Sequence, residues 1–409
     1  MVNNILNLVS SVVKKSAGAL LASLLLCACP VWGVVAKKSA PLKAAAKRST
    51  VKAAAPSAKA KLVLVKANTK PARARLRGGT GPWRVPTYAN SVEGDQFDGD
   101  DAVVREAAVS ALRGLNGTVV VGEAETGRVL TIVNQKLAFR DGFEPCSTVK
   151  IPVALAALSE SIVERDTPLR LNRFNSIDMT DALAKSNNQY FATLGEKLGF
   201  ERMSAYARQF GLGEKAGLNI AEERVGLLPA SAPKSGMGMM TSFGEGIRLT
   251  PLQLTALVGA IANGGTLFYL QYPRTLEEGL AFLPQVKRKL EIDALIPEIM
   301  PGLKGAVDYG TARRIAADLG EGIYGKTGTC TDERSPTHLG WFGSFMETPR
   351  GRLVVTTLLT GGRPVSGPVA AGVAGQVYRN LETAGYFLRT TSDSMIPGFA
   401  SQVAGKVAR

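Results

Sequence analysis

The sequence predicts an α/β fold, of the mixed α+β kind, built around one central sheet. Three observations support this prediction: a strand pair opens the folded body, helical patterns fill its middle, and three strand-like runs precede a closing helix. Because strands come from both ends of the body, we expect the two ends of the chain to complete the same sheet.

A β-hairpin is expected at the start of the body. Strand-like residues run over 118–122 and again over 128–133. The intervening Glu125-Thr126-Gly127 is a turn sequence, because glycine accepts the backbone conformations that a tight turn requires.

The middle of the body is predicted to be helical. One helix is well bounded by Thr250-Pro251 and Asn263-Gly264-Gly265, since Thr is a common N-cap, Pro fits the first turn and Asn-Gly-Gly ends a helix. Further helices are expected over 147–163, over 181–198 with an interruption at 186–188, and over 201–210. The last part should contain strands over 323–329, 339–345 and 353–360 and a closing helix over 369–387.

Charge is distributed unevenly along the 409 residues. The formal net charge is +15, with 49 Lys and Arg against 34 Asp and Glu. Residues 1–85 hold 16 of the basic residues and no acidic one, which leaves 33 basic against 34 acidic residues in the rest. The basic excess therefore belongs to an N-terminal arm, and we expect no nucleic acid as a partner.

The first 36 residues look like an export segment. Lys14 and Lys15 precede an apolar run over 17–36, which is the pattern of a secretory signal peptide. A run of about 20 residues is also long enough to span a bilayer. Two interpretations stay open: a cleaved signal peptide, or an N-terminal anchor in the inner membrane. Either one predicts an exported protein of the periplasm or cell envelope.

Composition divides the remaining chain into three parts. Residues 37–113 form a basic Ala/Lys/Pro-rich linker and lead-in, of which residues 37–85 have few large apolar side chains. We favour a solvated spacer there over a segment that adheres to anionic wall polymers or lipid head groups. Residues 114–390 are the expected catalytic domain, and residues 391–409 are a C-terminal tail.

One of several Ser-x-x-Lys matches has a context that suits catalysis. The matches begin at Ser11, Ser49, Ser147 and Ser231. Only Ser147 opens an apolar helical run, whereas the others lie in the export segment, the linker and a Pro-rich loop. Lys150 lies one helical turn beyond Ser147 on the same face. Because a serine is a weak nucleophile until a base takes its proton, Ser147 and Lys150 are the candidate nucleophile and base.

Two further fragments follow in the order typical of serine acyl-enzymes that act on D-Ala-D-Ala peptides and β-lactams. Ser186-Asn187-Asn188 is predicted to supply a proton relay and a substrate contact, with a helix-capping turn as the simpler alternative. Lys326-Thr327-Gly328-Thr329 is predicted to supply a cation and a strand along which the substrate pairs. A second Lys-Ser-Gly match, at 234–236, has no strand pattern after it.

With these motifs, residues 114–387 resemble the transpeptidase domain of penicillin-binding proteins, within the serine β-lactamase superfamily. The resemblance extends to strings outside the three motifs, namely Gly244-Glu245-Gly246, Thr250-Pro251-Leu252-Gln253-Leu254 and Gly310-Thr311-Ala312. It implies a penicillin-binding/β-lactamase-like fold, with a central antiparallel sheet of about five strands flanked by helices and with a helical subdomain.

The resemblance also implies catalytic roles. Ser147 would attack the D-Ala-D-Ala peptide bond, and Lys150 would take its proton. Ser186 would pass a proton between Lys150 and the leaving amine. Asn188 would contact both the lysine and the substrate amide.

The last motif is expected to bind substrate. Lys326 would bind the substrate carboxylate, with the Thr327 and Thr329 hydroxyls assisting. Gly328 would leave room for the substrate beside the strand. The backbone N–H groups of Ser147 and Thr329 would form the oxyanion hole.

The implied function is a penicillin-binding D,D-transpeptidase or D,D-carboxypeptidase that acts on peptidoglycan stem peptides and binds β-lactam antibiotics. Two alternatives stay open, because the stretch between Lys150 and Ser186 is short and the residues around Ser147 also resemble class D β-lactamases and related receptors. They are a class D-like serine β-lactamase and a non-catalytic β-lactam-sensing domain. No cofactor is implied, and the single His338 with two separated cysteines makes no ordinary metal site.

Cys146 and Cys330 directly flank the nucleophile and the Lys-Thr-Gly-Thr run. If the N–H groups of Ser147 and Thr329 face one oxyanion, the resemblance brings these cysteines within disulfide range, and an exported location allows oxidation. The alternative is two unpaired cysteines whose side chains point apart.

Overall fold

The computed structural model describes residues 83–217, 220–315, 319, 322–332 and 336–388. The expected signal peptide or anchor at 1–36, the basic arm up to residue 82 and the tail at 391–409 lie outside these residues. Within the described part, none of the helices is both long and apolar enough to cross a membrane.

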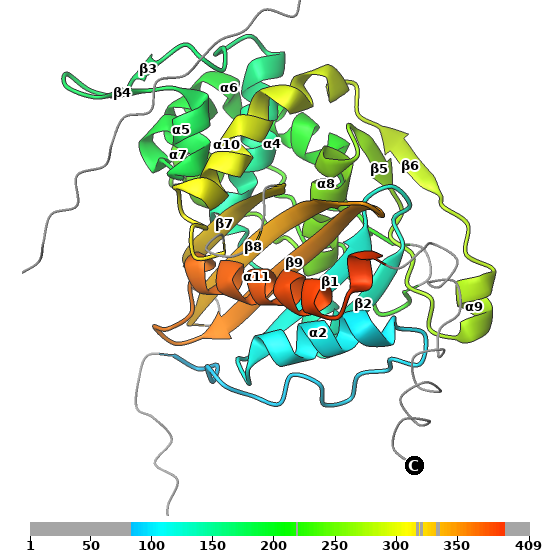
Figure 1. Cartoon of the computed structure of the whole chain (residues 1–409). Coiled ribbons are helices and arrows are strands. Elements are labelled where there is room, and N and C mark those ends of the chain that lie inside the picture. The colour runs from blue at the N-terminus through cyan, green and yellow to red at the C-terminus, as the bar shows by residue number, and fades with distance from the viewer. Residues whose placement is uncertain (1–82, 218–219, 316–318, 320–321, 333–335, 389–409) are drawn as a thin grey trace, which may run out of the picture. The chain divides into compact units, whose positions relative to one another are not determined.

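A five-stranded antiparallel sheet forms the centre of the fold, in the order β2-β1-β9-β8-β7 (Figure 1). The strands are β1 (Gly117–Glu123), β2 (Val129–Val133), β7 (Ile323–Asp332), β8 (Thr337–Thr348) and β9 (Gly351–Gly361). The prediction that two strands from the front and three from the back share one sheet is confirmed. The strand order places β7 at one edge of the sheet.

Helices cover both faces of this sheet (Figure 1). On β1, Val119 and Val121 enter one buried cluster and Val120 enters the other, because successive side chains of a strand point to opposite faces. One face packs against α2 (Ala102–Leu112) and α11 (Gly367–Thr383). This arrangement explains why β1 reads as a continuous apolar run.

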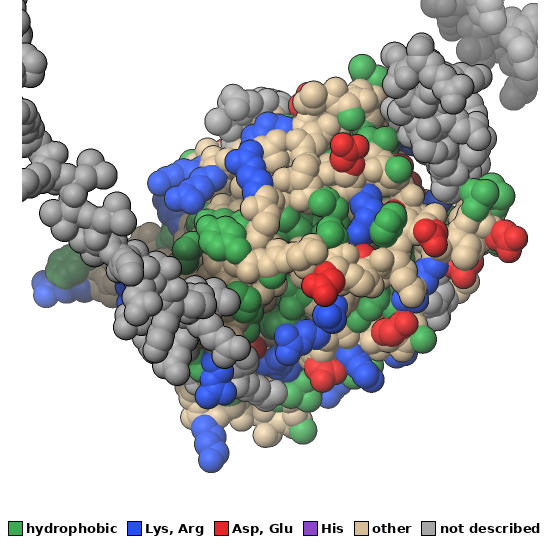
Figure 2. All heavy atoms as spheres, turned by 90° about the horizontal axis from the view of Figure 1, so that it is seen from below, with side chains coloured by type: hydrophobic (Ala, Val, Ile, Leu, Met, Phe, Trp, Pro, Cys, Tyr) green, Lys and Arg blue, Asp and Glu red, His purple; other side chains and the backbone are tan. Residues whose placement is uncertain are grey.

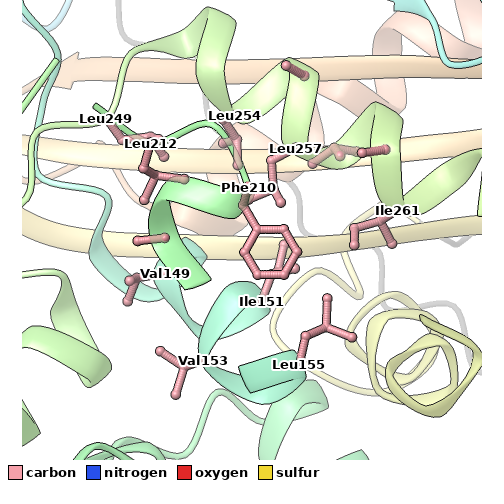
Figure 3. Packing of buried hydrophobic residues seen from close by; sticks show 14 of the residues in the cluster. Val149, Ile151, Val153, Leu155, Phe210, Leu212, Leu249, Leu254, Leu257 and Ile261 are labelled. Atoms are coloured by element: carbon pink, nitrogen blue, oxygen red, sulfur yellow. The ribbon is translucent and has the colours of Figure 1, made fainter. Parts of the chain in front are cut away.

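The other face carries the helical part of the fold. Figure 3 shows Val149 and Ile151 in the same core as Phe210 and Leu257. The helices of this side are α4 (Lys150–Ser159), α5 (Met179–Ala184), α6 (Asn188–Gln209), α7 (Met237–Phe243), α8 (Pro251–Ala262) and α10 (Ile296–Asp308). The remaining elements are α3 (Gln135–Ala138), α9 (Leu276–Leu280), the hairpins β3 (Leu169–Arg170)–β4 (Ser176–Ile177) and β5 (Thr266–Phe268)–β6 (Val286–Lys289), and the 3₁₀ turns η1 (Cys146–Val149), η2 (Asp293–Leu295) and η3 (Tyr386–Leu388).

The ends of the helices follow local chemistry. At the start of α8 the Thr250 hydroxyl accepts from the Gln253 N–H, and the Gln253 side chain accepts from the Thr250 N–H, which is a complete capping box. The expected helix over 147–163 instead begins as η1 and ends at Ser159, because Ser161 takes a left-handed backbone conformation. The helix expected over 181–198 is interrupted after α5, and its second part joins the helix expected over 201–210 in α6, at a kink at Gly199.

The lead-in before Gly114 is part of the folded body. Asp101 caps α2, and Val104, Ala108 and Leu112 are buried in the core beneath α11. Arg105 makes a buried ion pair with Asp100 over 3.0 Å. The packed body therefore begins before residue 114, because α2 covers apolar sheet surface that would otherwise face water.

The surface of the body carries both signs of charge. Figure 2 shows lysines and arginines beside aspartates and glutamates on the face seen from below. This mixture agrees with the near balance of charge outside the N-terminal arm.

Candidate active site

Ser147 lies in the first turn of η1, immediately before α4. The preceding Cys146 has a φ of 51°, a left-handed conformation that is strained for a residue with a side chain. Neighbours hold this turn in place: the Thr148 hydroxyl donates to the Pro145 carbonyl over 2.7 Å, and Trp341 Nε1 donates to the Glu144 carbonyl over 2.9 Å. Ser147 therefore lies in the first turn, where backbone N–H groups have no partner within the helix and the helix end is electropositive.

The Lys150 amine is the centre of the site. Its Nζ lies 2.9 Å from Ser147 Oγ, 3.1 Å from Ser186 Oγ and 2.6 Å from Asn188 Oδ1. It also donates to the Ser186 carbonyl over 3.0 Å. The side chain is fully buried, and this burial lowers the pKa of Lys150 to about 7. An amine with that pKa is able to act as a base near neutral pH.

The turn between α5 and α6 brings Ser186 and Asn188 to the lysine. Ser186 has a φ of 57°, and the Asn187 side chain caps α6 by accepting from the Tyr190 N–H. The Asn188 carbonyl accepts from Ser242 Oγ over 2.8 Å, which fixes the start of the helix. Asn187 is thus the cap of α6, while the side chains of its two neighbours contact Lys150 Nζ.

Lys326 approaches from the opposite wall, on edge strand β7. Its side chain is fully buried, and its Nζ donates to the Thr327 carbonyl over 3.2 Å. Burial holds the pKa of Lys326 well below its usual value, and the charge of Lys150 acts in the same direction. The two lysines therefore share a dry region between α4 and β7.

The next three residues of the strand have different surroundings. Thr327 Oγ1 lies 2.6 Å from Thr311 Oγ1, whereas Thr329 Oγ1 accepts from the Gly367 N–H over 2.7 Å. A Cβ at Gly328 would lie 3.0 Å from the Pro145 carbonyl oxygen. The glycine is therefore explained by the close approach of the nucleophile's turn, a constraint that the sequence argument had assigned to the substrate.

A disulfide joins the two walls. The sulfur atoms of Cys146 and Cys330 are 2.01 Å apart, and their Cα atoms are 5.5 Å apart. The bond connects the residue before Ser147 to the residue after Thr329, as the hypothesis of a bridge beside the oxyanion hole requires. It closes a sequence separation of 184 residues.

Comparison with protein families identifies the fold's relatives. Residues 117–379, more than half of the chain, match the family model described as penicillin binding protein transpeptidase domain. The chain belongs to this family. The recognition made from the motifs is thereby confirmed.

Similar proteins include stage V sporulation protein D of Bacillus subtilis, which is 29% identical over 283 residues, 61% of this chain and 44% of that protein. The peptidoglycan D,D-transpeptidase FtsI of Escherichia coli is 27% identical over 254 residues, 52% of this chain and 43% of that protein. The matched region thus spans less than half the length of these two relatives.

Solved structures show the same fold. PBP2 of Pseudomonas aeruginosa aligns with a TM-score of 0.59 at 23% identity, covering 72% of this chain and 78% of that chain. The transpeptidase domain of penicillin-binding protein 3 from Burkholderia pseudomallei aligns with a TM-score of 0.59 at 20% identity, covering 69% and 93% respectively. These similarities support the fold prediction of an antiparallel sheet flanked by helices.

Several residues around the candidate active site were not predicted from the sequence. The Ser242 hydroxyl donates to the Asn188 carbonyl, and Trp341 Nε1 donates to the Glu144 carbonyl in the turn before Ser147. Arg248 pairs with Asp332 over 3.0 Å at the far end of β7. Thr311 belongs to Gly310-Thr311-Ala312, one of the sequences that carry the family resemblance. Its contact with Thr327, 16 residues away, could not be predicted from that sequence. Over the described ranges, no cluster of His, Cys, Asp and Glu suits a metal ion.

Proposed function

We propose that this protein is a D,D-transpeptidase, or a D,D-carboxypeptidase, that acts on D-Ala-D-Ala stem peptides of peptidoglycan through a Ser147 acyl-enzyme. The contact between Lys150 Nζ and Ser147 Oγ over 2.9 Å, with a buried lysine whose pKa is lowered to about 7, carries the proposal. Membership of the family and relatives named as D,D-transpeptidases support it. We also propose an exported, cell-envelope location and assign residues 114–390, extended by the packed lead-in, to the catalytic domain.

In the first step, Ser147 Oγ forms a bond to the carbonyl carbon of the penultimate D-alanine. Its proton passes to neutral Lys150, and the carbonyl oxygen becomes an oxyanion that accepts from the N–H groups of Ser147 and Thr329. Collapse breaks the peptide bond, and the leaving amine takes a proton from Lys150 through the Ser186 hydroxyl, which lies 3.1 Å from Nζ. Free D-alanine departs, and the ester on Ser147 remains.

In the second step, an amine of another stem peptide attacks the ester carbonyl. It loses one proton to Lys150 as the bond forms, and Ser147 regains that proton as the acyl group leaves. Attack by water in place of the amine gives the carboxypeptidase product. Asn188 Oδ1, 2.6 Å from Lys150 Nζ, keeps the lysine in place through both steps.

Specificity for a terminal D-alanine is assigned to the Lys326 wall. A carboxylate is an acceptor only, so a cation and hydroxyl donors are its natural partners. Lys326 has a lowered pKa in the described structure, and an arriving carboxylate would favour its charged form. The substrate thus completes a charge pair that the free site lacks.

Labelled penicillin tests the acyl-enzyme directly. We expect the label on the tryptic peptide that contains Ser147, and we expect its loss in Ser147→Ala. Ser49→Ala is the matched control, since Ser49 begins the same tetrapeptide, Ser-Thr-Val-Lys, in the basic arm. Undiminished labelling of Ser147→Ala would overturn the assignment.

A second measurement distinguishes the reactions that this site could support. The protein is incubated with a D-Ala-D-Ala stem peptide and an acceptor peptide, and the products are analysed by mass spectrometry. A cross-linked product, or release of D-alanine alone, supports transpeptidase or carboxypeptidase activity respectively. Rapid hydrolysis of a chromogenic cephalosporin without reaction of the peptide would instead favour the β-lactamase alternative.

A further inference from the structure

Thr311 lies in the segment that follows α10, and this segment packs closely against the end of α5. The Thr311 N–H donates to the Ala184 carbonyl over 3.2 Å. A Cβ at Gly310 would lie only 2.2 Å from the same oxygen, so only glycine fits there. Ala184 is two residues before Ser186, so Thr311 is anchored to the wall that carries the proton relay.

The Thr311 side chain reaches the other wall. Its Oγ1 lies 2.6 Å from Thr327 Oγ1 on β7. Buried Ala312, whose N–H donates to the Ala306 carbonyl over 2.7 Å, ties the segment to α10 as well. One residue thus connects the Ser186 turn with the Lys-Thr-Gly strand.

We propose that Thr311 is a positioning residue that orients the Thr327 hydroxyl toward the terminal carboxylate of the substrate, an inference that rests on the proposed function. Each threonine hydroxyl has a single proton, so only one of the pair donates to the other. When Thr311 donates, the Thr327 proton is free for the carboxylate, which only accepts. The resulting chain from Thr311 through Thr327 to the carboxylate strengthens each of its hydrogen bonds.

The surroundings of the strand explain why Thr327 depends on this help. Thr327 and Thr329 share one face of β7, because strand residues alternate. On that face Thr329 Oγ1 accepts from the Gly367 N–H at the start of α11, so a backbone N–H fixes that hydroxyl oxygen. Lys326 points to the opposite face, where Lys150 lies. Thr311 is therefore the neighbour that sets the direction of the Thr327 proton.

Loss of the Thr311 hydroxyl should slow acylation by substrates with a free carboxylate and should leave acylation by their esters nearly unchanged. Thr311→Val keeps the shape of the side chain but removes the hydroxyl. We expect the second-order rate of Ser147 acylation by a penicillin with a free carboxylate to fall by roughly tenfold, the effect of one weakened hydrogen bond to a charged group. Acylation by the methyl ester of the same penicillin should change less than about twofold, and Thr311→Ser should restore the wild-type ratio of the two rates.

Controls separate this role from a structural one. Thr193→Val removes a threonine hydroxyl that donates to a helix carbonyl in α6, and it should leave both rates unchanged. If Thr311→Val does not fold, Thr311→Ala tests the same hydroxyl without added bulk. Equal losses for acid and ester, or no loss for either, would refute the role of Thr311. If the wild-type protein takes no label at Ser147, it is the proposed function that fails instead.

Discussion

At the scale of single residues, two opposing effects act on the pKa of Lys150. Oxygen atoms of Ser147, Ser186 and Asn188 surround its amine and favour the protonated form. Removal from water disfavours that form, and burial is the effect that determines the lowered pKa. A lysine on an exposed helix face could not serve as a base, so the depth of the site is part of its chemistry.

The pH dependence of acylation follows from this balance. Because the proposed base is the neutral amine, the rate of labelling by penicillin should rise with pH through about 7 and level off above it. Below pH 7 the rate should fall by about tenfold per pH unit. Rates measured from pH 5 to 9 test this, and a flat profile would contradict it. Lys150→Ala should abolish labelling, whereas Lys197→Ala, at an exposed lysine of α6, should not.

The lowered pKa of Lys150 also makes the free energy of unfolding depend on pH. The folded-state pKa of Lys150 lies below the ordinary value of 10.5, so between about 7 and 10.5 the unfolded chain binds more protons at this residue. The contribution of Lys150 to the free energy of unfolding therefore rises as the pH rises through that window. The predicted acylation rate thus rises below about pH 7, whereas this contribution to stability rises above it.

At the scale of elements, the site depends on two that are held together, the turn η1 and the edge strand β7. A strained Cys146 backbone, the close approach of Gly328 and the Cys146–Cys330 bond all occur at this junction. The N–H groups proposed for the oxyanion hole belong to the residues beside the bond. A change in the distance between η1 and β7 should therefore lower the rate of acylation more than it lowers the affinity for substrate.

The disulfide gives a test of this coupling. A non-reduced digest should contain the Cys146 peptide linked to the Cys330 peptide, as read by mass spectrometry. The double variant Cys146→Ala/Cys330→Ala should lose about 2–5 kcal/mol of unfolding free energy, since the bond closes a long loop. We also expect slower acylation in this variant. Two free thiols at these positions in oxidised protein would refute the bond.

At the scale of the whole molecule, the body is a sheet with both faces buried, and its two covering layers have different origins. The catalytic face is built by helices from the middle of the chain, whereas the opposite face is built by α2 and α11 from its ends. Helix α11 from the end of the body contacts β7 directly, and α2 from its start packs against α11. The basic arm contributes none of the motif residues.

Truncation distinguishes the arm from the lead-in. Removal of residues 1–82 should leave the melting temperature and penicillin labelling of the body unchanged. Removal of residues 1–113 also deletes α2, whose buried side chains include Val104 and Leu112. Each such side chain contributes about 1.5–3 kcal/mol, so the longer deletion should unfold or aggregate. Equal stability of the two truncated proteins, measured by thermal denaturation, would contradict this view of the lead-in.

Sequence reasoning predicted the elements that have strong local signals. The hairpin at Glu125-Thr126-Gly127, the capped helix after Thr250 and the strands of the C-terminal part were all predicted from turn, cap and strand chemistry. The lead-in helix was not predicted, because residues 86–113 were grouped with the basic linker; the Asp101 cap before an apolar, Ala-rich run is the local signal that marks it. Residues 147–149 were expected to be α-helical, but they belong to the tighter 3₁₀ turn η1. The packing of this turn against β7, which explains the difference, is not visible in the sequence.

The sequence alone determined the family, because the order and spacing of three short motifs are properties of the chain itself. It also distinguished Ser147 from the other three Ser-x-x-Lys matches, since local apolar patterning depends only on neighbours in sequence. Only the tertiary structure decided the depth of Lys150, the contact of Thr311 with Thr327 and the closeness of Cys146 to Cys330. These depend on burial and on distances between segments remote in sequence, which are set only when α4, α10 and β7 pack together.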